Sequence, residues 1–434
     1  MQNFENKKYL IYGFGISGRS CFKYLKKKNC SIKIYDDNLK LYKTYNKYKI
    51  KKNNIPRFRF DFVVISPGIH LKNCSLKNYL KKNKNKIINE LDLFYQNYET
   101  NKKITITGTN GKSTTAKLVY EIFKYCKKDV RLVGNIGKPL LNQKNIKKHT
   151  IFIIEASSYQ IDYYKNFKTD IAVILNLSPD HLDRHKTFSN YANTKFKLIK
   201  SMKPNGIAII KKNSKILTNL IKKNKIKSKI FKIDDEIDKK FELKITNKLF
   251  YNLNNKLNLK FALEICKIFN LKKIKFIKAI NSFKTLPYRQ QILLDNSKLF
   301  IMNDSKSTSF SSTIENLKSY KNIYWIVGGV AKKGDKLQLD LKYRKNIKAY
   351  LYGVDKIFFS KQLQNKIYFK KFENLSQTLK HIMLDMRNDN KKKYLIFSPS
   401  GASFDQFKNF EARGKYFNLL LNKLKFVNQI NDNK

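Results

Sequence analysis

The residues best suited to chemistry form one short glycine loop. It comprises Gly108, Thr109, Asn110, Gly111, Lys112, Ser113 and Thr114. Glycines let backbone N–H groups turn towards phosphate oxygens, and the N-terminus of a following helix adds a partial positive charge there. Lys112 would neutralise the outer phosphates of ATP, and the Ser113 hydroxyl would bind Mg²⁺. A plain glycine turn is the alternative, but a lysine followed by two small hydroxyl residues favours a phosphate loop.

The spacing of this loop departs from the common pattern G-x-x-x-x-G-K-[ST]. Ile106 occupies the position of the expected first glycine, so the pattern here is the shorter G-x-x-G-K-S-T. The context is nevertheless the one that a phosphate loop needs, because the expected strand Ile104–Thr107 precedes the loop and a helix is expected from about Lys112 to Tyr125.

A second glycine turn, Gly13 to Gly18, fits G-x-G-x-x-G and follows the apolar run Tyr9–Tyr12. Asp36 lies about twenty residues further on, where an acid binds a ribose hydroxyl in dinucleotide sites. Gly68, in S-P-G-I, adds a turn after the expected strand Phe62–Ser66. The pattern alone allows NAD, but any nucleotide diphosphate can bind at such a helix N-terminus, and the ATP loop lies elsewhere in the chain.

Two segments in the middle of the chain carry side chains that could bind metal. Glu155 ends the apolar run Ile151–Ile154, and a carboxylate at the C-terminal end of a strand is well placed for Mg²⁺. His181 stands beside two aspartates after the expected strand Ile171–Leu175. From the residues alone, Glu155 could also be an acid at a helix start and His181 a solvated loop histidine.

Two polar segments follow in the C-terminal third. In N-D-S-K-S-T, Asp304 could hold the ribose of ATP while Lys306 and Thr308 face the other substrates. In S-P-S-G-A-S-F-D-Q-F, small residues leave room for backbone donors to bind a carboxylate, and Ser403 adds a hydroxyl. Taken alone, the first segment is more simply a polar turn.

These segments together resemble the Mur ligase family and its relatives, the folylpolyglutamate synthetases, in five motif clusters that run in the family order from Gly13 to Phe410. Family members use ATP to convert a carboxylate into an acyl phosphate, which an amine attacks to form an amide. GFGISG with SPGI, and the run SFDQF, are similar to the branch that adds D-glutamate to UDP-N-acetylmuramoyl-L-alanine. The resemblance implies that function here, in the cytoplasmic synthesis of peptidoglycan precursors on which cell-wall biogenesis, cell shape and cell division depend.

The resemblance also implies a metal site. Glu155 in E-A-S-S-Y-Q matches a metal-binding glutamate, and His181 in D-H-L-D matches a ligand of a second Mg²⁺. Lys195 is singled out only because Y-A-N-T-K matches the family's Y-x-x-x-K, whose lysine is carbamylated by CO₂ and ligates or orients the second Mg²⁺. The expected catalytic residues are Lys112, His181 and Lys195. The expected metal ligands are Ser113, Glu155, His181 and, if carbamylated, Lys195.

The remaining site residues follow from the same motif matches. The expected ATP-binding residues beyond the phosphate loop are Asn255, Asn258, Arg289 and Asp304. The expected UDP-substrate-binding residues are Gly15, Ile16, Ser17, Asp36, Gly68 and Asn135. The expected D-glutamate-binding residues are Lys306, Thr308, Lys332, Ser403 and Phe410. The chain departs from the family pattern at Asn254 and Tyr288, which replace the usual histidines.

Composition limits the other functions. The net charge of +59 in 434 residues comes from 82 Lys against only 9 Arg, scattered along the chain with abundant Asn, Ile, Phe and Tyr. We attribute this to mutational drift in an AT-rich genome rather than to nucleic-acid binding, which favours arginine. No uncharged apolar run of about 18 residues and no signal-peptide layout is found, so a cytoplasmic protein without membrane partners is expected. We also expect a monomer. The five cysteines form no CxxC and are expected to be reduced thiols.

Alternating strand and helix signals position these residues in an α/β fold. We expect three domains, each a mostly parallel sheet with flanking helices: a Rossmann-like UDP-substrate domain (1–98), a central ATPase domain of the phosphate-loop type (99–285) and a Rossmann-like amino-acid domain (286–434). Further strands are expected at Ser31–Tyr35, Ile323–Val327, Ala349–Tyr352 and Tyr394–Ser398, and a helix at Ser17–Lys28. The elements between about 210 and 250 are not placed by the pattern.

Three alternative functions remain. The first is another Mur-type or folylpolyglutamate-type ligase, although D-N-P-R, typical of the diamino-acid-adding relative, is absent. The second is an NAD-dependent dehydrogenase, suggested by the first glycine turn. The third is a nucleic-acid-binding ATPase, suggested by the charge.

Overall fold

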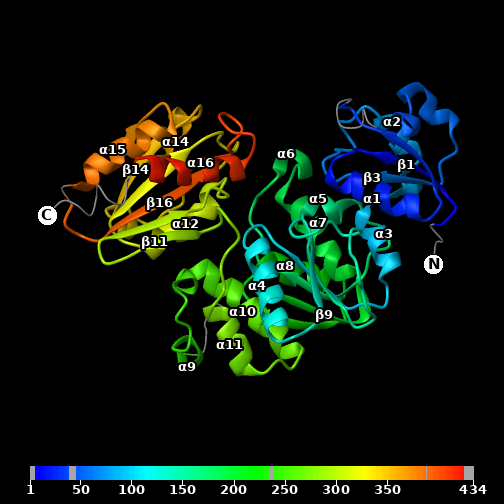
Figure 1. Cartoon of the computed structure of the whole chain (residues 1–434), viewed down its shortest axis with the longest axis horizontal. Coiled ribbons are helices and arrows are strands. Elements are labelled where there is room, and N and C mark those ends of the chain that lie inside the picture. Colours follow the sequence, from blue (N-terminus) through cyan, green and yellow to red (C-terminus); the bar gives the residue numbers. More distant parts are fainter. Residues whose placement is uncertain (1–4, 39–44, 235–238, 388, 425–434) are drawn as a thin grey trace. The chain divides into compact units, whose positions relative to one another are not determined.

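The computed structural model describes residues 5–38, 45–234, 239–387 and 389–424 (Figure 1). The chain divides into two compact units, residues 1–236 with 260–276 and residues 237–259 with 277–434. The first unit contains two sheets and the second contains one, so each sheet falls within one of the three domains expected from the sequence.

The first sheet has four parallel strands in the order β2-β1-β3-β4. Its strands are β1 (Lys8–Tyr12), β2 (Ser31–Tyr35), β3 (Phe62–Ile65) and β4 (Ile87–Ile88). The helices are α1 (Ile16–Lys27), α2 (Lys77–Lys82), α3 (Glu90–Asn97) and the short 3₁₀ turns η2 (Lys52–Arg57) and η3 (Lys84–Lys86). Successive side chains of β1 enter separate apolar clusters, Tyr9 and Ile11 in one and Leu10 and Tyr12 in the other, so the sheet is buried on both faces.

The second sheet has six parallel strands in the order β10-β9-β8-β5-β7-β6. They are β5 (Lys103–Thr107), β6 (Val130–Gly134), β7 (Ile151–Glu155), β8 (Thr169–Ile174), β9 (Met202–Lys211) and β10 (Lys229–Ile233). The helices of this segment are α4 (Lys112–Tyr125), α5 (Ser158–Tyr163), α6 (Leu182–His185), α7 (Phe188–Lys200) and α8 (Lys215–Lys223). The strand order reverses at the β5–β8 pair, because β6 and β7 lie on one side of β5 and β8 to β10 on the other. Ligands of open α/β sheets bind at the carboxyl ends of strands at such a switch point.

The third sheet has the order β11-β12-β16-β13-β14-β15, and only β11 runs antiparallel to its neighbour. The strands are β11 (Gln291–Asp295), β12 (Leu299–Asn303), β13 (Ile323–Gly328), β14 (Ile347–Tyr352), β15 (Tyr368–Lys371) and β16 (Lys393–Ser400). The second unit also contains α9 (Lys239–Glu242), η4 (Lys248–Tyr251), α12 (Phe310–Ser319), α13 (Leu341–Arg344), α14 (Lys356–Leu363), α15 (Leu375–Arg387) and α16 (Phe410–Lys423). The helices α10 (Leu253–Ile268) and α11 (Lys273–Asn281) each contain a boundary between the units.

The α/β fold with mostly parallel sheets is confirmed, and the expected strands and helices differ from the observed ones by at most two residues at each end. The stretch that the pattern did not place contains the end of β9, then α8, β10, α9 and η4. All five cysteines are free thiols. Across the described ranges, no helix is long and apolar enough to cross a membrane.

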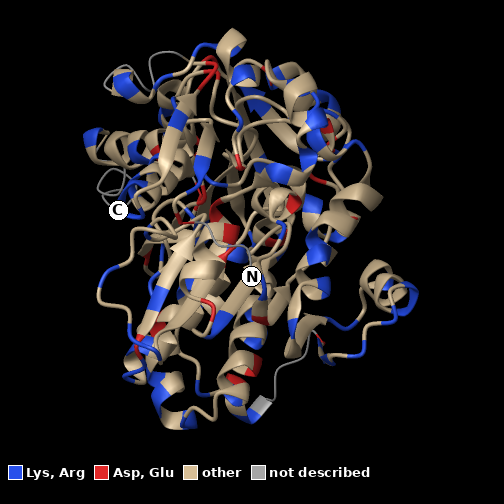
Figure 2. Cartoon of the chain, turned by 90° about the vertical axis from the view of Figure 1, so that its right-hand side faces the viewer, with Lys and Arg blue, Asp and Glu red and all other residues tan. Residues whose placement is uncertain are grey.

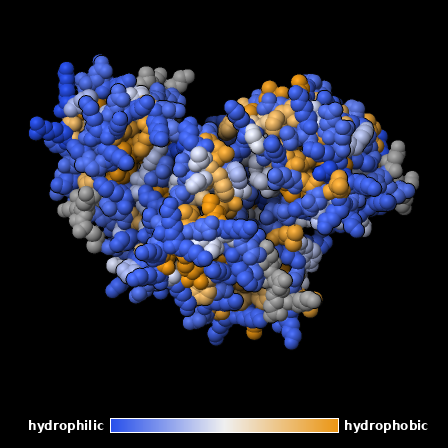
Figure 3. All heavy atoms as spheres, turned by 180° about the vertical axis from the view of Figure 1, so that it is seen from behind, coloured by the Kyte–Doolittle hydropathy of each residue, from blue (hydrophilic) through white to orange (hydrophobic). Residues whose placement is uncertain are grey.

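The surface carries its charge in a dispersed form. Figure 2 shows Lys and Arg on helices, strands and loops throughout the chain, with Asp and Glu between them. On the face drawn in Figure 3, most of the surface is hydrophilic and the hydrophobic areas are small and separate. This distribution agrees with a general lysine bias and not with one basic binding face.

Candidate functional site

The phosphate loop joins the buried central strand β5 to α4. Gly111 is the N-cap of α4 with φ +81°, a left-handed conformation that favours glycine, and Gly108 has φ +155°. A side chain at Gly108 would also come within 3.1 Å of Leu175 Cβ. These two glycines therefore fix where the strand ends and the helix begins.

Asn176, two residues after the end of the neighbouring strand β8, holds the loop in place through hydrogen bonds. The Asn110 N–H donates to Asn176 Oδ1 at 2.8 Å, and Asn176 Nδ2 donates to the Asn110 carbonyl at 3.1 Å. The Thr109 N–H also donates to the Asn176 carbonyl at 3.0 Å. Asn176 was not predicted as a site residue, because its contacts are to main-chain atoms of a segment 66 residues away.

Lys112 lies against its own loop. Its Nζ donates to the carbonyls of Gly108 at 2.8 Å and Thr109 at 2.7 Å. The ammonium is therefore held at the carboxyl end of β5, where the backbone N–H groups of the loop and the start of α4 also lie. Ser113, the next residue, is buried in the first turn of α4.

Glu155 ends β7, the strand beside β5, and is 1% exposed. Its Oε1 accepts a hydrogen bond from Asn135 Nδ2 at 3.0 Å, while Oε2 is buried and accepts none from the described residues. Gly134, before Asn135, has φ +107° and lies so close to β7 that a Cβ would be 2.3 Å from the Glu155 carbonyl. A buried carboxylate oxygen without a donor is costly unless a cation binds it. This is the feature of the site that best fits a metal ion.

Lys195, on α7, is 1% exposed, and its Nζ donates to Thr107 Oγ1 at 3.1 Å. The Nζ also lies 4.9 Å from the centroid of the Tyr191 ring. Burial, and secondarily the charge of Lys112, lower the pKa of Lys195 well below the usual lysine value, and Glu155 only partly opposes this. The neutral amine is the form of lysine that can react with CO₂, so the environment suits carbamylation.

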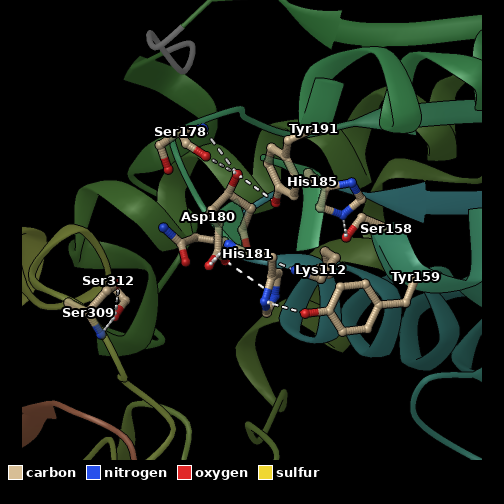
Figure 4. Close-up of polar contacts among 12 residues, drawn as sticks. Lys112, Ser158, Tyr159, Ser178, Asp180, His181, His185, Tyr191, Ser309 and Ser312 are labelled. Carbon is tan, nitrogen blue, oxygen red and sulfur yellow. Dashed lines mark hydrogen bonds and ion pairs between the residues drawn. The ribbon is translucent and has the colours of Figure 1, made fainter. Parts of the chain in front are cut away.

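His181 has a left-handed backbone (φ +52°) at the start of α6. Figure 4 shows its ring next to Tyr159, whose hydroxyl is 2.9 Å from His181 Nδ1. A hydrogen bond at one ring nitrogen orients the other, as is usual for metal-binding histidines. His185, one turn further on, was not predicted; it is buried and its Nε2 lies 3.1 Å from Ser158 Oγ (Figure 4).

The glycine turn after β1 is held by buried polar contacts. Asp36 accepts hydrogen bonds from the N–H groups of Phe14 at 2.5 Å and Asn38 at 2.7 Å, so its first role is to fix this turn. Gly18 approaches the Gly13 carbonyl so closely that a Cβ there would be 2.1 Å from it. Ile16 is 79% exposed at the start of α1, although it is apolar.

The open edge of this turn agrees with a ligand site. Neither Gly15 nor Gly68 has a heavy atom within 4 Å of the position of a Cβ, so space is open beside both. Ser17 is the second residue of α1. Gly15, Ile16 and Ser17 follow β1, Asp36 follows β2 and Gly68 follows β3. The expected UDP-substrate residues of the first domain therefore lie after the carboxyl ends of three neighbouring parallel strands.

In the second unit, Asp304 follows β12 and belongs to a buried hydrogen-bond network. Its Oδ1 accepts from the Gln290 N–H at 3.1 Å, and its Oδ2 accepts from Asn316 Nδ2 at 2.9 Å. Burial raises the pKa of Asp304 to about 7, although these donors oppose the shift. Gln290 continues the network, because its Oε1 accepts from Asn255 Nδ2 at 2.5 Å. The structure thus joins two expected ATP-binding residues, Asn255 and Asp304, through Gln290, which was not predicted.

Asn258 lies one turn after Asn255 on α10 and donates to its Oδ1 at 3.2 Å. Both asparagines are buried. Because they are three residues apart, they lie side by side on one face of the helix.

The expected D-glutamate residues all belong to the second unit, and one of them, Lys306, lies against the ring of another, Phe410. Lys306 Nζ lies 4.5 Å from the centroid of the Phe410 ring, and the Arg289 guanidinium carbon lies 5.3 Å from it. Ser403 is buried, and Thr308 lies two residues beyond Lys306.

Lys332 lies on the loop after β13, which reaches the Ser403 segment. Val330 and Ala402 exchange two backbone hydrogen bonds of 2.8 Å, so the two loops run side by side. Arg413, which was not predicted, is fully buried and donates to the carbonyls of Ser305 at 2.8 Å and Gly401 at 2.9 Å. It therefore ties the N-D-S-K-S-T segment to the segment that contains Ser403.

Comparison with known proteins agrees with this arrangement. Residues 106–272 match the Mur ligase middle domain. The UDP-N-acetylmuramoylalanine--D-glutamate ligase of Rickettsia bellii is 34% identical over 442 residues, covering 95% of this chain and 97% of the relative. The ligase of the same name from Caldicellulosiruptor bescii is 28% identical, covering 97% and 98%.

Solved structures share the fold at much lower identity. The MurF ligase of Thermotoga maritima in complex with ADP has a TM-score of 0.57 at 14% identity and covers 98% of this chain and 99% of its own. The UDP-N-acetylmuramate-alanine ligase MurC of Thermotoga maritima has a TM-score of 0.56 at 12% identity, covering 96% and 100%. Together with the full-length relative at 34% identity, these likenesses lead to one conclusion: the chain belongs to the Mur ligase family.

Proposed function

We propose that this protein is the ATP-dependent ligase that joins D-glutamate to UDP-N-acetylmuramoyl-L-alanine, a cytoplasmic step of peptidoglycan precursor synthesis. The observation that carries the chemistry is the cluster at the carboxyl ends of β5 and β7. There, the phosphate loop with Lys112 lies beside the donor-free carboxylate oxygen of Glu155 and the buried amine of Lys195, whose pKa is lowered by burial. The substrate assignment is supported by full-length relatives of that name.

In this proposal, each domain binds a different substrate. Residues 1–98 bind the UDP-substrate through Gly15, Ile16, Ser17, Asp36 and Gly68, with Asn135 added from the central segment. Residues 99–285 bind ATP, and residues 286–434 bind the incoming amino acid. Asn255 and Asn258 hold the adenine side of ATP, Asp304 its ribose and Arg289 its phosphates.

The first chemical step transfers a phosphoryl group. A carboxylate oxygen of the UDP-substrate attacks the γ-phosphorus of ATP, the bond to the β-phosphate oxygen breaks, and an acyl phosphate and ADP result. Two anions meet in this step, so catalysis depends on charge neutralisation and alignment. Lys112 supplies a positive charge when its Nζ leaves the loop carbonyls for the phosphates.

The donor set also fits magnesium. Ser113 and Glu155 would bind one ion and His181 with a carbamylated Lys195 a second, and Mg²⁺ would neutralise the phosphate oxygens. Within the described ranges, no group of three or more His, Cys, Asp or Glu side chains forms a complete metal site, so phosphate oxygens and water would have to complete each shell. Carbamylation joins the neutral Lys195 Nζ to the carbon of CO₂ and releases one proton, which leaves an anionic carbamate; counted from the ammonium form, two protons are released.

The second step forms the amide. The D-glutamate amine attacks the acyl carbon, loses a proton, and inorganic phosphate leaves. In this proposal Lys306, Lys332 and Ser403 bind the D-glutamate carboxylates, Thr308 lies with them and Phe410 packs against the amino acid. Exclusion of water protects the acyl phosphate from hydrolysis.

A substrate-omission assay tests the function. Phosphate release from ATP by purified protein should require both UDP-N-acetylmuramoyl-L-alanine and D-glutamate, and Lys112→Ala should abolish it while the circular dichroism spectrum is retained. Release with L-glutamate and a folate would transfer the assignment to the folylpolyglutamate synthetases. Salt-sensitive stimulation by DNA, or a nicotinamide-linked absorbance change, would instead support one of the other two alternatives.

A further inference from the structure

The turn that follows β3 is held by two side chains of the central segment. Arg184 Nη1 donates to the Pro67 carbonyl at 2.7 Å. The Tyr163 hydroxyl donates to the Ile69 carbonyl at 3.1 Å and accepts from the Leu71 N–H at 3.3 Å. We refer to Arg184 and Tyr163 as the loop clamp, and the turn they hold, residues 67–71, includes Gly68.

Aromatic packing fixes Arg184 in place. Its guanidinium carbon lies 4.0 Å from the centroid of the Tyr159 ring and 4.9 Å from that of the Tyr163 ring, both on α5. Such contacts are cation–π interactions, and they hold the planar group with its edge towards the turn. The side chain is therefore set before any ligand arrives.

Fold stability alone does not explain this arginine. Its Nε and Nη2 are buried and donate no hydrogen bond to any described residue. Two buried donors without acceptors are costly, and a residue of this kind is retained more readily for function than for stability.

One of the two rings that pack on Arg184 also contacts the proposed phosphoryl-transfer site. Tyr159, which packs on Arg184, places its hydroxyl 2.9 Å from His181 Nδ1, and the two rings have centroids 4.8 Å apart (Figure 4). A continuous set of contacts therefore runs from the turn at 67–71 through Arg184 and Tyr159 to the expected metal ligand.

We infer that Arg184 and Tyr163 are positioning residues that set the UDP-substrate turn in register with the phosphoryl-transfer site. The inference rests on the proposed function, because it concerns how that substrate's carboxylate is brought in line with ATP. Neither residue needs to touch a reacting atom. Loss of either residue displaces the turn that binds this substrate, which raises its KM, and a misplacement of about 1 Å can also cost roughly 100-fold in rate because the reacting groups must be aligned.

Steady-state kinetics with three variants tests the loop clamp. Arg184→Met keeps an unbranched chain against the two rings but removes the charge and the donors, and Tyr163→Phe removes only the hydroxyl. We expect KM for UDP-N-acetylmuramoyl-L-alanine to rise about 10- to 100-fold in Arg184→Met and about 3- to 10-fold in Tyr163→Phe, with KM for ATP within about 2-fold. Arg184→Lys should recover part of the loss, because one donor and the charge return.

Tyr164→Phe is the matched control. Tyr164 is the next residue, and its hydroxyl bonds Ser201 at 2.7 Å rather than the turn, so this variant should keep the wild-type KM for the UDP-substrate. A normal KM for the UDP-substrate in both Arg184→Met and Tyr163→Phe would overturn the inference. Equal rises in KM for the UDP-substrate, ATP and D-glutamate would also overturn it, because they would indicate a merely structural role. If the wild type itself has no turnover with the three substrates, the proposed function fails and the inference fails with it.

Discussion

Replacing Glu155 by glutamine tests the metal site through two measurements that should respond differently. The substitution keeps the side-chain volume, and a glutamine oxygen can still accept the 3.0 Å hydrogen bond from Asn135. It replaces the buried donor-free Oε2 with an NH₂ group, which cannot bind a cation. The change therefore removes the proposed metal ligand and leaves the packing nearly intact.

Without ligand, Glu155→Gln should leave the free energy of unfolding unchanged or raise it by up to about 2–3 kcal/mol. Loss of a buried carboxylate removes a desolvation cost of several kcal/mol, and the buried amide that replaces it costs about 1–3 kcal/mol. The side chain is 1% exposed, so solvent screening does not weaken this comparison. Catalysis should suffer much more, by about 100- to 1,000-fold in kcat, since charge stabilisation in the transition state is lost.

The assay is thermal or denaturant unfolding with and without Mg²⁺ and a nonhydrolysable ATP analogue. A ligand at 100 times its Kd stabilises the wild type by about 3 kcal/mol, and Glu155→Gln should lose most of that gain at the same concentrations. Glu121→Gln is the control, because Glu121 forms only a partly exposed ion pair with Lys117 on α4. An unchanged Mg²⁺-dependent stabilisation in Glu155→Gln would refute the assignment of this carboxylate as a ligand.

Three further predictions concern polar side chains that are buried or partly buried. Lys195→Met should lower kcat at least about 100-fold, and wild-type activity should fall in CO₂-depleted buffer and return with bicarbonate; an activity indifferent to CO₂ would argue against carbamylation. Gln290→Leu should raise KM for ATP about 5- to 20-fold, because Asn255 and Asn316 lose the Gln290 side-chain amide while the main-chain hydrogen bond to Asp304 remains, and an unchanged KM would show that this link is not needed. Burial raises the pKa of Glu90 to about 7, above its unfolded value near 4.3, so its contribution to stability is full at low pH and is lost as pH rises towards 7. Glu90→Gln should therefore weaken the fall in stability between about pH 4 and 7 by up to about 3 kcal/mol, and denaturant titrations that give parallel curves for variant and wild type would contradict this.

The elements that the sequence predicts well are those with a strong local signal. Strand β5 and helix α4 are predicted within one residue, because a β-branched run, two glycines and a lysine specify a strand, a turn and a helix start in order. The stretch after residue 210 lacks such contrast. Strand β10 reads K-I-F-K-I with only its last residue buried, and in a chain with 82 lysines this pattern hardly differs from the surrounding loops.

The motif residues are predictable for a related reason: their chemical types are rare or their spacing is special. Glu155, His181 and Asp304 each follow an apolar run that ends at the carboxyl edge of a sheet, so local pattern places them. Their environment is not predictable in the same way. The donor-free oxygen of Glu155 and the lowered pKa of Lys195 depend on burial, which only the packed structure determines.

Residues that position the motifs leave the weakest trace in the sequence. Arg184 binds the Pro67 carbonyl across 117 residues, and Arg413 binds the Ser305 carbonyl across 108. Every residue carries a carbonyl, so an acceptor of this kind gives no sequence signal, and the donor alone reads as one more surface cation. What distinguishes both arginines is a guanidinium, buried in Arg413 and partly buried in Arg184, that donates to main-chain carbonyls of another segment. Because a backbone carbonyl is held in place by the loop to which it belongs, such an arginine fixes the loop itself, and the motifs on that loop move with it.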